Sequence, residues 1–65
     1  MNTSSNTIPK LLTPDELAEF LQISKTSVYR MIEKRLIPFF KVKGSLRFDK
    51  QDVLEYLQKN RIEPI

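Results

Sequence analysis

The hydrophobic residues of this 65-residue chain recur three or four positions apart in three separate stretches, which predicts three short amphipathic helices. The first helix follows Thr13, the second covers residues 24–34, and the third follows Asp49. Each begins at a residue whose side-chain oxygen can accept a free backbone N–H of the first turn. The inward-facing residues predicted for the three helices are Leu17, Ala18 and Leu21, then Val28, Met31 and Ile32, then Val53, Leu54 and Leu57.

The start of the first helix has the largest number of sequence features that favour a helix N-terminus. Thr13 and Glu16 are spaced as a capping box, in which each side chain bonds the backbone N–H of the other. Pro14, between them, suits the first helical position. Only residues 22–24 separate the first two helices, and this spacing is typical of a helix-turn-helix, with Ile23 filling the corner.

The segment after the second helix alternates between apolar and polar residues, which predicts a two-stranded β-hairpin over residues 39–48. Gly44, the only glycine of the chain, lies where the turn needs a positive φ. A hairpin this small is unstable alone, so it must pack on the helices. Alternation predicts a buried face of Phe40, Val42, Leu46 and Phe48 and an outward face of Lys41, Lys43 and Arg47.

Between the second helix and the hairpin, Pro38 prevents the helix from continuing. Leu36 and Ile37 are expected to tuck under the domain. No glycine is available for a left-handed helix end, so Arg35 or a neighbour is expected to carry backbone strain. The predicted fold is mainly α with a small β-hairpin, a winged helix-turn-helix over residues 11–60. Residues 1–10 and 61–65 are expected to be flexible tails.

Charge is concentrated in the middle of the chain. The net charge is only +3, yet eight basic and two acidic residues lie between Gln22 and Lys50. The second helix therefore presents hydroxyls and fixed positive charge opposite its apolar stripe, and these are the groups that meet base edges and phosphates.

Composition argues against other classes of protein. The chain has no histidine, no cysteine and no glycine-rich phosphate loop, and its carboxylates are explained by helix capping or solvated surface. We therefore expect no enzyme activity, cofactor or metal site. No apolar run approaches the ~20 residues of a membrane span, and the cytoplasm is the expected location.

Several motifs together carry a family resemblance. The chain resembles the excisionase-type winged helix-turn-helix domain, a small relative of the MerR DNA-binding domain. It departs from the commonest family pattern at Gln22 and Arg35, which replace usual glycines, and at Leu46, which replaces a frequent aromatic. The matching segments are Leu-Leu-Thr-Pro-Asp-Glu-Leu-Ala-Glu-Phe-Leu (11–21), Ile-Ser-Lys-Thr-Ser-Val-Tyr-Arg-Met-Ile (23–32), Ile-Pro (37–38), Lys-Val-Lys-Gly-Ser-Leu-Arg-Phe (41–48) and Asp-Val-Leu-Glu-Tyr-Leu (52–57).

The resemblance implies that helix 24–34 enters the major groove and that hairpin 41–48 follows the DNA backbone or the minor groove. Arg30 suits guanine recognition through two hydrogen bonds, with a phosphate contact as the alternative. The candidate DNA-binding residues are Ser24, Lys25, Thr26, Ser27, Tyr29, Arg30 and Lys34 on the helix, and Lys41, Lys43, Ser45 and Arg47 on the hairpin.

The leading hypothesis is a small, non-catalytic protein that binds double-stranded DNA at the nucleoid. It would be an excisionase-like recombination directionality factor of a mobile element or a compact transcriptional regulator. With so small a face, useful affinity would need further copies on adjacent sites, a partner such as an integrase, or DNA bending. The alternative is a protein–protein interaction module that uses the same scaffold without DNA.

Overall fold

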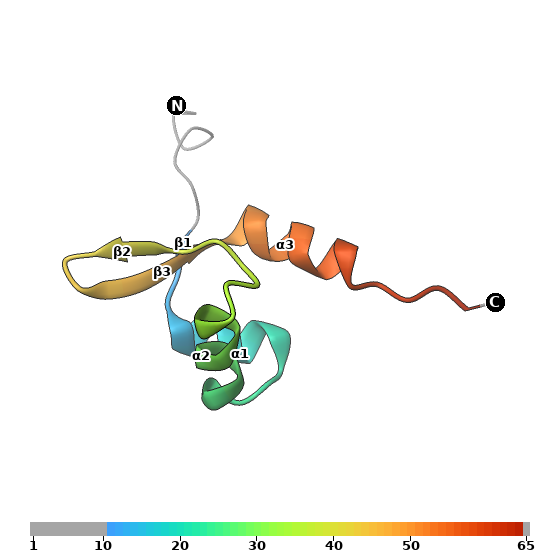
Figure 1. Ribbon diagram of the computed structural model, residues 1–65, viewed down its shortest axis with the longest axis horizontal. Coiled ribbons are helices and arrows are strands. Elements are labelled where there is room, and N and C mark those ends of the chain that lie inside the picture. The colour runs from blue at the N-terminus through green and yellow to red at the C-terminus, as the bar shows by residue number, and fades with distance from the viewer. Residues whose placement is uncertain (1–10, 65) are drawn as a thin grey trace, which may run out of the picture.

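The computed structural model describes residues 11–64, and the predictions made for residues 1–10 and for Ile65 lie outside them. The described part confirms the predicted winged helix-turn-helix (Figure 1). Its elements in chain order are β1 (Leu11–Leu12), α1 (Pro14–Leu21), α2 (Lys25–Glu33), β2 (Phe40–Val42), β3 (Ser45–Asp49) and α3 (Lys50–Lys59).

The three helices start where local hydrogen bonding predicts. At α1 the capping box is complete, because the Glu16 N–H donates to Thr13 Oγ1 at 3.1 Å and the Thr13 N–H donates to Glu16 Oε1 at 2.9 Å. At α2 the Ser27 N–H donates to Ser24 Oγ at 3.1 Å. At α3 Asp49 accepts the N–H of Gln51 at 2.9 Å. These bonds satisfy backbone donors that a helix leaves free in its first turn.

Helices α1 and α2 end in the same way, each on a residue with left-handed backbone. Gln22 has φ 58° and Arg35 has φ 56°, so the strain expected at Arg35 is confirmed. At each end the left-handed residue donates to a carbonyl three positions back, and the next residue donates five positions back. This pair of bonds is the Schellman motif, which usually contains glycine.

The sheet has three strands among the described residues, in the order β1-β3-β2, and so corrects the predicted two-stranded hairpin. Leu12 pairs with Phe48 in an antiparallel ladder that joins the chain before α1 to β3. The hydrophobic pattern of the sequence predicts no strand at Leu11–Leu12. A two-residue strand has too little sequence for an alternating pattern, so only its pairing partner reveals it.

The register of the hairpin differs from the prediction. Lys43 and Gly44 form a two-residue turn with φ 51° and 82°, so Val42 pairs with Ser45 and Phe40 pairs with Arg47. Two positive φ values are those of a type I′ turn. The prediction required a three-residue loop. Shortening a loop by one residue turns one strand over relative to the other, and Phe40 and Val42 lie on the outer face, about half exposed.

The core lies where α1, α2, β3 and the start of α3 meet. Its largest fully buried side chains are Phe48, Leu17, Val28 and Val53. Ala18, Met31 and Ile37 complete a cluster that is hydrophobic throughout.

Four further residues that were predicted to be buried are exposed. Leu54 and Leu57 are 42% and 41% exposed, although their helical phase predicts burial. Leu36 is exposed beside buried Ile37, and Ile23, expected in the corner, is also exposed. Helix α3 packs against the core through Val53 and the partly buried Tyr56, and it extends away from α1 and α2 (Figure 1), so Leu54 and Leu57 are left exposed.

Helices α1 and α2 lie together on one side of the strands, and the hairpin and α3 extend in opposite directions from the centre (Figure 1). The hairpin therefore projects from the sheet on the side opposite α3, and its strand β3 contacts α1 and α3. Within residues 11–64, no helix has the length and apolar character that a membrane crossing requires.

Candidate nucleic-acid interface

Helix α2 buries one side and exposes the other. Val28 and Met31 are buried in the core. At about 100° per residue, Thr26 and Arg30 project on the opposite side of the helix, and both are exposed. Tyr29 lies toward the margin and is 41% exposed. The helix thus offers a polar, cationic face to the surroundings.

One acidic residue, which is not among the binding residues predicted from the sequence, also belongs to this face. Glu33 is exposed and lies one turn along from Tyr29 and Arg30. Its carboxylate opposes phosphate binding, whereas carboxylates accept hydrogen bonds from the amino group of cytosine. A full helical projection of residues 24–34, without selection for basic residues, would have found it.

The two serines at the start of α2 are engaged with each other. Ser24 Oγ accepts the Ser27 N–H, and the two hydroxyls lie 3.0 Å apart in a hydrogen bond. Both side chains therefore serve the helix start, and each hydroxyl keeps remaining hydrogen-bonding capacity.

Lys25 is held by an ion pair with the neighbouring helix. Its Nζ lies 3.0 Å from Asp15 Oδ1, and both side chains are largely exposed. The hydrogen bond to Asp15 and the charge of that carboxylate raise the pKa of Lys25. The ammonium lies near the start of α2, where a phosphate would compete with Asp15 for it.

The basic residues of the hairpin are spread over both faces and the turn. Lys41 is paired with Leu46 and shares the sheet face of buried Phe48, the face toward α1. Arg47 points to the outer face, is half-buried, and donates from Nη1 to the Leu46 carbonyl at 2.7 Å. Lys43 occupies the turn, and Ser45 follows it. The register therefore separates Arg47 from Lys41, which the sequence predicted to point the same way.

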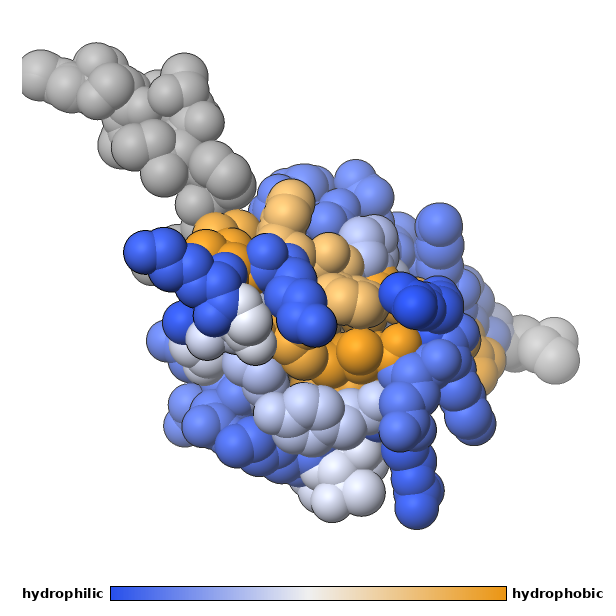
Figure 2. All heavy atoms as spheres, turned by 60° about the vertical axis from the view of Figure 1, so that its left-hand side comes forward, coloured by the Kyte–Doolittle hydropathy of each residue, from blue (hydrophilic) through white to orange (hydrophobic). Residues whose placement is uncertain are grey.

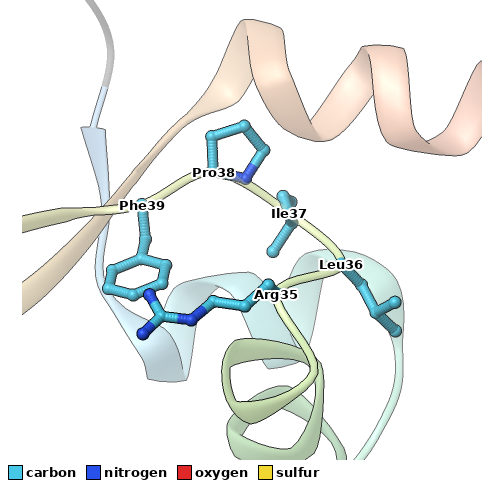
Figure 3. A pocket seen from close by; sticks show the side chains of 5 residues that line it. All are labelled: Arg35, Leu36, Ile37, Pro38 and Phe39. Atoms are coloured by element: carbon cyan, nitrogen blue, oxygen red, sulfur yellow. The ribbon is translucent and has the colours of Figure 1, made fainter.

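Seen from the side on which the hairpin projects, the surface has an apolar area bordered by long hydrophilic side chains (Figure 2). The loop after α2 forms a hollow of about 440 Å³, lined by Arg35, Leu36, Ile37, Pro38 and Phe39 (Figure 3). Arg35 is the only titratable residue in that lining, so the hollow lacks an acid–base pair. Within residues 11–64, no three acidic, histidine or cysteine side chains gather as a metal site would require.

Comparison with known proteins agrees with this architecture. A helix-turn-helix domain family matches residues 11–61, nearly all of the described part. The chain belongs to this family, which confirms the resemblance to excisionase-like domains inferred from its motifs. Membership supports a small DNA-binding helix-turn-helix domain.

The chain is also similar to a longer curated protein, named uncharacterized protein YvgK, of Bacillus subtilis (strain 168). The two are 36% identical over 64 residues, which is 97% of this chain. The chain spans only 19% of the length of that relative. No solved structure matches the chain significantly.

Proposed function

We propose that this chain is a non-catalytic module that binds double-stranded DNA, with α2 in the major groove and the hairpin against the backbone or the minor groove. The observation that carries the proposal is the division of α2 into a buried apolar side and an exposed side with Thr26, Arg30 and Lys34. An α-helix fits the major groove, and such side chains bind base edges and phosphates there.

The proposed contacts are of two kinds, contacts to base edges and contacts to phosphates. Arg30 makes the base contact, because its planar guanidinium can form two hydrogen bonds with a guanine edge. Thr26, Ser27 and Tyr29 lie near it on the helix and approach bases or phosphates. Phosphate contacts come from the remaining candidates, namely Ser24, Lys25, Lys34, Lys41, Lys43, Ser45 and Arg47.

Two biological roles fit such a module equally well. One is a recombination directionality factor that bends DNA and helps an integrase to assemble, and the other is a compact transcriptional regulator. Both would act in the cytoplasm at the nucleoid. Both would gain affinity from further copies on adjacent sites or from a partner protein. A neighbouring integrase gene would favour the first role.

A protein–protein interaction module is the second candidate, and the exposed hydrophobic residues favour it. Leu54 and Leu57 on α3 are about two-fifths exposed, and Leu36 in the loop is half exposed. Exposed apolar surface of this kind is frequent at sites of protein contact. A DNA-binding module can also bind a partner protein through such a surface. The protein–protein interaction module therefore replaces the DNA-binding proposal only if the protein does not bind DNA.

The deciding experiment is fluorescence anisotropy of the protein against a pool of short labelled duplexes at two salt concentrations. Salt-sensitive binding to a subset of duplexes is expected, since each neutralised phosphate adds about 0.9 to the slope of log affinity against log salt. Equal binding to all duplexes would indicate an architectural factor. Failure to bind any duplex at low salt would reject the proposal and leave the protein-interaction module.

Substitution of two residues separates base recognition from phosphate binding. Arg30→Ala is expected to change the preferred base at one or two positions, at a cost of about 1–3 kcal/mol against the best site. Lys43→Ala is expected to weaken all sequences alike and to lower the salt slope by about 0.9. Binding of both variants to the same duplex pool is the measurement. An equal loss on every sequence for both variants would show that Arg30 does not recognise bases.

A further inference from the structure

Arg35 occupies the junction between the two elements that are proposed to contact DNA. It follows the last turn of α2, and four residues later Phe39 leads directly into β2. Its N–H donates to the Ile32 carbonyl at 3.1 Å, and the next N–H, that of Leu36, donates to Met31 at 3.0 Å. These bonds fix the backbone at this point.

The Arg35 side chain is exposed and held in place by an aromatic ring. Its guanidinium carbon lies 5.7 Å from the centre of the Phe39 ring, within the range of a cation–π contact. The Phe39 ring in turn packs against Phe48 of the core, with ring centres 6.5 Å apart. In Figure 3 the side chain runs from the loop toward that ring, along the hollow lined by residues 35–39.

This guanidinium is available for an anion. The ion pairs found within residues 11–64 join Lys25 to Asp15 and Arg61 to Glu63, and neither involves Arg35. A guanidinium that stacks on a ring keeps its N–H edge directed sideways, where it can bind two oxygens of a phosphate. Stacking also reduces the side-chain entropy that binding would otherwise lose.

The backbone conformation at Arg35 is unfavourable for its residue type. Its φ of 56° lies in the left-handed region, where a glycine would be the least strained residue. Gln22 ends α1 with the same conformation, so the strain belongs to the helix-ending motif, and the guanidinium stacked on Phe39 is what distinguishes Arg35.

We infer that Arg35 is a further DNA contact, which binds a backbone phosphate between the major-groove helix and the hairpin. The inference rests on the proposed function, because it needs DNA to touch both elements. When α2 and the hairpin lie on the same duplex, the backbone segment between their contacts passes the junction where Arg35 and Phe39 lie. Arg35 binds this segment without recognising sequence.

The test compares Arg35→Gly with Gln22→Gly. Both replace a left-handed residue in the same helix-ending motif, so both relieve the same strain and are expected to raise the melting temperature by about 2–6 °C. Only Arg35→Gly removes a guanidinium. Against the duplex pool at 50–300 mM salt, it is expected to bind about three- to tenfold more weakly on all sequences and to lower the salt slope by about 0.9.

Two further results complete the test. Arg35→Lys keeps the charge and is expected to keep the salt slope of the unsubstituted protein, whereas Gln22→Gly is expected to keep both affinity and slope. If Arg35→Gly binds with unchanged affinity and slope while the unsubstituted protein binds DNA, the role of Arg35 is wrong and the proposed function stands. If the unsubstituted protein binds no duplex at 50 mM salt, both fall together.

Discussion

Three residues other than glycine adopt left-handed backbone in the described part of this protein, and each lies at the end of an element. Gln22 and Arg35 end α1 and α2, and Lys43 is the first residue of the hairpin turn. Left-handed backbone is unfavourable for side chains with a Cβ atom, by roughly 1–2 kcal/mol. The hydrogen bonds of the two helix ends and of the turn offset this cost.

The starts of the helices, by contrast, are stabilised by side-chain hydrogen bonds to backbone N–H groups. The bond at the start of α1 gives a prediction for a single residue. Thr13→Ala removes the side-chain acceptor of the Glu16 N–H and is expected to reduce the free energy of unfolding by about 1 kcal/mol. In a domain of this size the loss lowers the melting temperature by about 4–8 °C, measurable by circular dichroism.

Thr13→Ser is the matched control, since it keeps a hydroxyl at the same place and is expected to lose less than half as much. Equal melting temperatures for Thr13→Ala and the unsubstituted protein would show that the capping box does not contribute to stability.

At the scale of elements, the hairpin depends on its two-residue turn. Lys43 and Gly44 both have positive φ, which gives the turn the twist that antiparallel strands need. The turn sets the register, and the register sets which residues each face presents. The exposed apolar pair Phe40 and Val42 on the outer face is thus a consequence of turn length.

The type I′ turn predicts that substitutions at Lys43 and Gly44 change the stability of the protein in opposite directions. Gly44→Ala is expected to destabilise the protein by about 1 kcal/mol through backbone strain alone, because a Cβ atom there meets no other atom within 4 Å. Lys43→Asn is expected to stabilise it by about 0.5 kcal/mol, since asparagine tolerates left-handed backbone and Asn-Gly favours this turn. Thermal unfolding of both variants is the measurement.

Lys43→Asn also removes a proposed phosphate contact, so its DNA affinity is expected to fall although its stability rises. The same sign of stability change for both variants would contradict the type I′ turn.

For the whole molecule, stability is concentrated in a small core. The cluster around Leu17 and Phe48 joins helices α1 and α2 to the sheet, whereas most of α3 lies outside it. A domain this small buries a limited share of its surface, so single core residues make large contributions. Surface hydrophobic residues contribute less, whatever their type.

The core and the register together predict a contrast between two phenylalanines of the hairpin. Phe48 is fully buried and Phe40 is 47% exposed. Phe48→Leu is expected to cost about 1–2 kcal/mol, and Phe40→Leu less than about 0.5 kcal/mol. Urea unfolding of the two variants measures both values. Equal losses would support the register with a three-residue loop, in which both rings are buried.

Local hydrogen bonding and helical periodicity are determined by neighbours in the chain, and for this reason the sequence predicted the three helices, their caps, the short turn at residues 22–24 and the strain at Arg35. The basic character of α2 and of the hairpin was also evident, since charge depends on composition alone. Together these features were enough to predict the winged helix-turn-helix.

Only the tertiary structure decided what depends on distant partners. The strand at Leu11–Leu12 exists because β3 lies beside it, and Leu54 and Leu57 are exposed because α3 packs against the core through Val53 and Tyr56 instead. The hairpin register followed from the backbone of two turn residues, one of them a lysine that carries no turn signal. The stacking of Arg35 on Phe39 required the loop between them to fold back. Periodicity shows which residues share a face of a helix or strand. Burial and strand pairing depend on where a second element packs, and the local sequence pattern does not determine that position.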